Sequence, residues 1–110
     1  MKIFKNVSPY EIIDSKTFVK NSKNGISSKA VIDNNNVEMR FFSASKGEDI
    51  DKEIYFEETL FFCLEGKLKV IYKDDGEVIL NSNDMVVIES NVLYGIVALE
   101  DTKYFNILVK

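Results

Sequence analysis

The spacing of apolar residues along the chain changes near residue 26. From there to the end, short runs rich in Val, Ile, Phe and Tyr are separated by Asn, Asp and Gly, which is typical of an antiparallel sandwich or barrel. In residues 37–42, VEMRFF, every second position from the first is apolar, as in a strand that buries one face. No stretch of ten or more residues after position 20 combines helical spacing with caps. The sequence therefore predicts an all-β fold.

Turn-forming residues divide this region into strands. Asp75 and Gly76 lie between KLKVIYK and EVIL, and they favour a two-residue hairpin because both tolerate positive φ angles. Glu65 and Gly66 mark a second tight turn. A barrel or a two-sheet jelly roll hides the edges of such a sheet within about 100 residues. Strands are expected in TLFFCLEG, KLKVIYKDDGEVIL, DMVVIES, VLYGIVAL and KYFNILVK.

Residues 1–25 differ in character from the rest of the chain. They hold the only proline, and SPYEII can begin a short helical turn with Ser8 as N-cap and Pro9 at the first helical position. A chain of 110 residues is long enough for one core and too short for two independent domains. We therefore expect residues 1–25 to form a short N-terminal arm packed on a single barrel made by residues 26–110.

The charge balance narrows the range of partners. With 14 basic and 18 acidic residues the net charge is -4, so the chain weakly repels phosphate backbones and anionic lipids. No apolar run approaches the roughly 20 residues of a membrane-spanning helix, and polar residues interrupt the first segment, unlike a signal peptide. We expect a cytoplasmic protein that binds neither nucleic acid nor membrane.

The single cysteine, Cys63, cannot form a disulfide within the chain, which agrees with a reducing compartment. It lies in the apolar run TLFFCL, where a small buried hydrophobe is favoured over a reactive thiol. The chain contains no histidine, so no serine can form a nucleophilic triad with an imidazole.

Two segments resemble the conserved blocks of the cupin superfamily, in its small single-domain, RmlC-like form. They are EETLFFCLEGKLKV and VILNSNDMVVIESNVLYGIVA, and the likeness extends over residues 26–110. The resemblance implies a jelly-roll β-barrel. In that family the first block carries two histidines and a metal-binding glutamate, and the second block carries a third histidine.

This chain departs from the family at the metal-binding positions. Aligned on Gly66, the family's glutamate falls on Thr59, its first two histidines fall within residues 52–55, and its third histidine falls on Tyr94. None of these positions holds an imidazole, although iron, nickel, copper and zinc favour imidazole or thiolate ligands. We therefore predict a barrel without a metal or any other cofactor.

Carboxylates, tyrosines and one arginine are the groups left for chemistry. Tyr94 with Glu53 or Tyr55 can form an acid-base pair at the barrel mouth if a pKa is shifted towards neutrality; otherwise these side chains fill the barrel. Arg40, the only arginine, is either an outward charge paired with a nearby acid or an anchor for an anionic ligand. The sequence assigns no catalytic residue.

Alternation along the strands outlines the barrel interior. If Thr59 faces inward, Phe61 and Cys63 do too, and an inward Tyr94 implies an inward Ile96. Such a lining suits a small apolar or aromatic ligand held by a few polar contacts. The predicted ligand pocket comprises Arg40, Ile54, Tyr55, Thr59, Phe61, Cys63, Tyr94 and Ile96.

The opposite face of the TLFFCL strand carries Leu60, Phe62 and Leu64. Because these residues are also large and apolar, a second sheet, the arm or a partner subunit must cover them. We predict a homodimer on this basis.

The resulting hypothesis is a metal-free, cupin-like protein that binds or senses a small molecule. A fold of this kind does not by itself establish catalysis. One alternative is a cofactor-free isomerase, lyase or epimerase that uses Tyr94 and a carboxylate. The other is a protein-interaction module that presents an exposed strand face.

Overall fold

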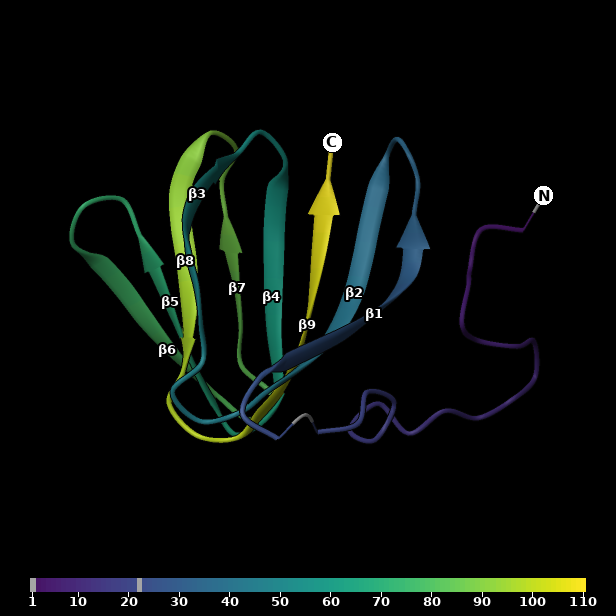
Figure 1. Cartoon of the computed structure of the whole chain (residues 1–110). Coiled ribbons are helices and arrows are strands. Elements are labelled where there is room, and N and C mark those ends of the chain that lie inside the picture. The colour runs from purple at the N-terminus through teal and green to yellow at the C-terminus, as the bar shows by residue number, and fades with distance from the viewer. Residues whose placement is uncertain (1, 22) are drawn as a thin grey trace.

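The chain is almost entirely β-structure in a computed structural model (Figure 1). The structure describes residues 2–21 and 23–110; within them there is no helix, and so none that could cross a membrane. The all-β prediction is confirmed. The strands are β1 (Ile26–Asp33), β2 (Val37–Ala44), β3 (Asp49–Tyr55), β4 (Glu58–Glu65), β5 (Lys67–Tyr72), β6 (Gly76–Asn81), β7 (Met85–Ile88), β8 (Val92–Ala98) and β9 (Thr102–Val109).

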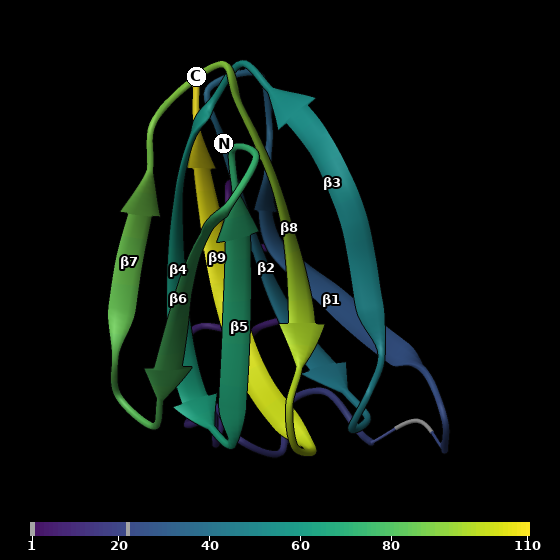
Figure 2. The same cartoon turned by 90° about the vertical axis from the view of Figure 1, so that its left-hand side faces the viewer.

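The strands form two antiparallel sheets. The first sheet has five strands in the order β1-β2-β9-β4-β7, and the second has four in the order β3-β8-β5-β6. The two perpendicular views in Figures 1 and 2 show that the two sheets lie opposite each other. Side chains from the two inner faces fill the space between them. The predicted jelly roll is therefore confirmed.

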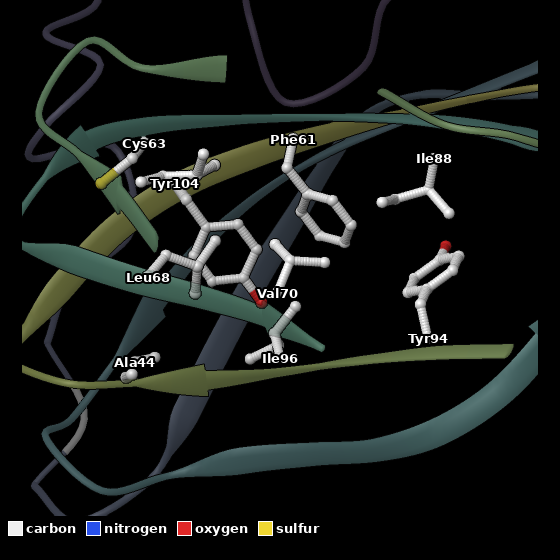
Figure 3. Packing of buried hydrophobic residues seen from close by; sticks show 11 residues of the cluster. Ala44, Phe61, Cys63, Leu68, Val70, Ile88, Tyr94, Ile96 and Tyr104 are labelled. Atoms are coloured by element: carbon white, nitrogen blue, oxygen red, sulfur yellow. The ribbon is translucent and has the colours of Figure 1, made fainter. Parts of the chain in front are cut away.

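Every second residue of β4 and of β8 points inward, and these residues form much of the core. On β4, Thr59, Phe61 and Cys63 are at most 2% exposed, and on β8 Tyr94 and Ile96 are at most 5% exposed. Figure 3 shows members of this cluster packed between the sheets. The inward orientation predicted for both strands is confirmed, and so is the burial of the cysteine.

Strand β2 turns its more apolar face outward. Arg40 and Phe42 face the space between the sheets, whereas Met39 and Phe41 lie on the outer face and are half-buried. The pattern VEMRFF predicted one buried apolar face, and that interpretation is wrong. The outer face of β2 is apolar because part of it is covered by the arm, where Phe18 meets Phe41 edge to face at 5.5 Å between ring centroids.

Gly66 allows the chain to pass from the first sheet to the second. It has a φ of +96°, and a Cβ atom there would lie 2.4 Å from the backbone oxygen of Asp101. Both conditions exclude a side chain at this turn. The tight turn expected at Glu65 and Gly66 is confirmed.

The β5-β6 hairpin has a longer turn than predicted. Tyr72 pairs with Gly76, so residues 73–75 form the turn, and Lys73 rather than Gly76 adopts a positive φ, of 57°. The predicted two-residue turn at Asp75 and Gly76 is wrong. Gly76 has a packing role instead, because a Cβ there would lie 2.5 Å from the Tyr72 ring.

The N-terminal segment contacts the five-stranded sheet at two places. The Lys5 amide donates to the Val31 carbonyl at the β1 edge, over 2.9 Å. Further along, Val19 is 5% exposed and its carbonyl accepts a hydrogen bond from the Lys103 ammonium. The predicted helical turn is wrong. The Glu11 amide does donate to the Ser8 carbonyl, but Tyr10 within this turn has a φ of 67°, which is outside the range of a right-handed helix.

Candidate functional site

A cavity of about 200 Å³ lies between the two sheets. Its walls come from inner-face residues of β2, β4 and β9 on one side and of β3 and β8 on the other. Across the first sheet, Arg40 of β2 pairs with Asn106 of β9, which in turn pairs with Phe61 of β4. A guanidinium, an amide and an aromatic ring therefore stand side by side in one row of the cavity wall.

Aromatic rings make up most of the remaining wall. Tyr55 and Tyr94 stack with 4.8 Å between ring centroids, and Phe61 meets Tyr94 edge to face at 5.6 Å. Phe42 stacks on Tyr104 at 4.6 Å. Such paired rings are fixed in position by their own packing, so the cavity offers a preformed aromatic surface.

The position of Arg40 agrees in part with each of its two predicted roles, an outward charge paired with an acid and an anchor for an anionic ligand. Its Nη1 donates to the Ser28 hydroxyl over 3.0 Å, and its Nε lies 3.7 Å from a carboxylate oxygen of Glu38. It does pair with a nearby acid, but it lines the cavity rather than facing away from it. A half-buried ion pair of this length contributes little to stability, and its guanidinium has further N–H donors.

Two polar atoms in the cavity wall have no protein partner. The Tyr104 hydroxyl and Oδ1 of Asn106 are buried and make no hydrogen bond within residues 2–21 and 23–110. Both side chains come from β9 and line the cavity. Figure 3 shows the Tyr104 ring reaching from β9 into the space between the sheets. Buried polar atoms without partners are rare and call for an explanation.

A hydrogen bond between Thr59 and Tyr94 joins the two sheets. Their hydroxyl oxygens lie 2.7 Å apart, and either can donate. These are the positions onto which the family resemblance placed the metal-binding glutamate and the third histidine. The contact between them shows that the alignment brought together residues that are neighbours in the fold, with hydroxyls in place of metal ligands.

Burial shapes the acidity of the tyrosines. It raises the pKa of Tyr94 to about 12, against a smaller lowering by the bond to Thr59, and it also raises the pKa of Tyr104. The pKa of Tyr55 is raised by burial and then by its hydrogen bond to Glu53, to which its hydroxyl donates over 3.2 Å. All of these phenols are protonated at neutral pH.

The structure brings together five of the eight residues predicted for the pocket. The other three do not line it: Thr59 is fully buried and hydrogen-bonded to Tyr94, Ile54 is 67% exposed, and Cys63 is packed in the core. Burial raises the pKa of the Cys63 thiol. The binding role of the pocket stays a prediction. The five that line the cavity are Arg40, Tyr55, Phe61, Tyr94 and Ile96.

Sequence reasoning missed the contribution of β9. Tyr104 and Asn106 lie in KYFNILVK, and alternation places both on the same face. The sequence does not show which strands flank β9, because its partners β2 and β4 are distant along the chain. Among the described residues, no group of three or more His, Cys, Asp or Glu side chains could hold a metal ion.

Comparisons with known proteins identify the fold. No family model matches the sequence, and no curated protein matches it. A conserved protein of unknown function from Streptococcus pyogenes is similar over 100% of this chain and 96% of its own, with a TM-score of 0.95 and 16% identity. A cupin superfamily protein from Desulfitobacterium hafniense is similar over 96% of both chains, with a TM-score of 0.90 and 23% identity.

An enzyme is among the similar structures with lower TM-scores. Salicylate 1,2-dioxygenase from Pseudoaminobacter salicylatoxidans, solved in complex with gentisate, is similar over 81% of this chain and 26% of its own, with a TM-score of 0.70 and 17% identity. RmlC-like cupins are among the further similar structures. The chain is thus a double-stranded β-helix of the jelly-roll class. Its fold is that of the cupins, as the sequence resemblance implied.

Proposed function

We propose that this chain is a cytoplasmic binding or sensing protein that holds a small aromatic monocarboxylate between its two sheets. The observation that carries the proposal is the cavity itself, in which Arg40 and two unpartnered polar atoms, on Tyr104 and Asn106, stand among aromatic rings. Pockets of this kind use an apolar lining for affinity and a few polar groups for orientation.

The size of the cavity limits the ligand. An apolar cavity of about 150 Å³ accepts benzene, so a cavity of about 200 Å³ has room for one ring that carries small polar substituents. The Arg40 guanidinium can hold a carboxylate in a bidentate way. A hydroxyl on the ring could donate to Oδ1 of Asn106 and accept from the Tyr104 hydroxyl, which would give both buried atoms a partner.

The similarity to known structures supports an aromatic ligand in this fold, because one of them was solved with gentisate. The tyrosine pKa values favour binding over the alternative of a cofactor-free isomerase. General acid-base catalysis works best with a pKa near the working pH, whereas the pKa of Tyr94 is raised to about 12 and its hydroxyl bonds Thr59 rather than a carboxylate.

The test is calorimetric titration with benzoate, hydroxybenzoates and the uncharged benzyl alcohol. We expect a hydroxybenzoate to bind best and benzyl alcohol to bind weakly. Arg40→Ala should weaken the acids by roughly 10-fold or more, the value of one charge-assisted hydrogen bond, and leave benzyl alcohol unchanged. Lys67→Ala is the matched control, because Lys67 pairs with Glu100 outside the cavity.

Either of two results would refute the proposal. One is equal affinity for the acids in wild type and Arg40→Ala. The other is that none of the acids binds at millimolar concentration. Circular dichroism of each variant checks that the fold is retained, so a loss of binding is assigned to the side chain and not to unfolding.

A further inference from the structure

A groove of about 290 Å³ opens between β6 and β7. These two strands are edge strands of different sheets, and Figure 2 shows them on the side of the molecule opposite β1 and β3. The volume is close to the lower limit for ligand sites, about 300 Å³. The groove is therefore large enough for a small molecule.

The lining of the groove is mostly branched aliphatic. Ile88 is 6% exposed, and Val78, Val86 and Val92 are partly buried and packed against the core. Because the core holds these side chains in place, the apolar surface exists before a ligand arrives. The five aliphatic residues of the lining are Val78, Val86, Val87, Ile88 and Val92.

The groove is separate from the cavity that contains Arg40, and no residue lines both. On one sheet Val86 of the groove pairs with Phe61 of the cavity, and on the other Tyr72 pairs with Tyr94. Phe61 and Tyr94 meet edge to face across the interior, with 5.6 Å between ring centroids. These two rings stand between the groove and the cavity, so the groove is a second site.

The groove also carries one charge of each sign. Nζ of Lys73 lies 3.8 Å from a carboxylate oxygen of Glu89, and both residues belong to the lining. The backbone of Lys73 is fixed, because its amide donates to the Leu93 carbonyl over 2.8 Å and its carbonyl accepts from the Lys52 ammonium over 3.1 Å. An ion pair this exposed contributes little to stability, so a ligand that brings a partner for each charge can replace it.

The edge of β7 adds a backbone donor and a backbone acceptor. The Cys63 amide donates to the Asp84 carbonyl over 2.9 Å. Since bonded pairs alternate along an antiparallel ladder, the β4-β7 register makes Val86 and Ile88 the bonded positions and turns the N–H and C=O of Val87 to the free side. No strand within residues 2–21 and 23–110 pairs with that side.

We propose that this groove binds a free α-amino acid with a branched aliphatic side chain, such as leucine. The side chain lies on the aliphatic lining, the carboxylate faces Lys73 and the ammonium faces Glu89. A simple fatty acid would place its carboxylate near Glu89 without compensation, and a simple amine would do the same near Lys73. Only a zwitterion complements both charges. This proposal does not depend on the function proposed for the cavity.

The test is a titration followed by amide chemical shifts in NMR. The probes are L-leucine, isocaproate, which is leucine without its ammonium, and isoamylamine, which is leucine without its carboxylate. We expect leucine to shift the amides of β7 and to bind about 5-fold more tightly than either analogue, the upper value for one exposed ion pair.

Two variants assign the two charges. Lys73→Met should weaken leucine about 5-fold without weakening isoamylamine, and Glu89→Gln should weaken leucine by a similar factor without weakening isocaproate. Lys69→Met is the matched control. Its ammonium lies 3.8 Å from a carboxylate oxygen of Glu77, the same separation, but neither residue lines the groove. It should bind leucine as wild type does.

Three results would overturn the proposal. They are the absence of β7 shifts with millimolar leucine, equal affinity of wild type for leucine and both analogues, and equal affinity of Lys73→Met and Lys69→Met for leucine. Circular dichroism checks that each variant is folded. Arg40→Ala should bind leucine like wild type, so this outcome is distinguishable from failure of the cavity to bind an aromatic acid.

Discussion

The bond between Thr59 and Tyr94 can be removed without changing the shape of either side chain. Thr59→Val deletes one hydroxyl and leaves that of Tyr94 buried, with the residue 5% exposed. An unpaired buried hydroxyl costs about 1–3 kcal/mol. For a domain of this size, each kcal/mol lowers Tm by about 4 °C or more. Tyr94→Phe should have a similar cost, because it leaves the Thr59 hydroxyl without a partner.

The double variant separates the bond from the packing. Replacing both groups leaves no polar atom unpaired, so Thr59→Val with Tyr94→Phe should cost less than the sum of the two single changes by about 1 kcal/mol. Guanidinium unfolding with a constant m-value measures each free energy of unfolding. Tyr10→Phe is the control, because Tyr10 is fully exposed and should change stability very little. Additive costs in the double variant would refute a bond between the two hydroxyls.

Three further predictions concern single groups. The pKa of Tyr94 is about 12 in the folded chain against an ordinary 10.0, so the folded state keeps a proton that the unfolded state releases. The free energy of unfolding should therefore fall as the pH rises from 10 to 12. The fall should be less steep in Tyr94→Phe, and unfolding experiments at several pH values measure the difference. Cys63 is fully buried and should react with a thiol reagent only at the rate of unfolding; rapid labelling of the native protein would contradict this. Lys103→Met should speed proteolysis within the arm, because it removes the hydrogen bond to the Val19 carbonyl, and an unchanged cleavage rate would show that this bond does not hold the arm.

The fold was predictable because strand periodicity and turn residues are local signals. On β4 the alternation of Thr59, Phe61 and Cys63 gave the correct inner face, since a regular strand has a strict period of two. On β2 the same reasoning failed, because both faces carry apolar residues and the inner face also carries Arg40. A binary pattern cannot distinguish a face buried by the second sheet from one covered by an arm.

The candidate site was only partly predictable because it depends on pairing between distant strands. Ile54 was placed in the pocket and Ile50 was not, whereas the structure has Ile50 lining the cavity and Ile54 exposed. An irregularity between Ile50 and Glu53 in the β3-β8 pairing shifts the register, and a shift of one residue exchanges the two faces. Such a bulge leaves no clear mark in the sequence.

Strands β2, β4 and β9 carry the cavity wall on one side and, on the other, the outer face of the sheet with Phe41, Phe62 and Phe105. Arg40 and Phe41 are neighbours in the chain, as are Phe61 and Phe62. Deleting or inserting one residue in any of these strands would therefore exchange both surfaces at once. Insertions can accumulate in the loops during evolution, but the lengths of these three strands are constrained twice, and homologues that keep one surface should keep the other.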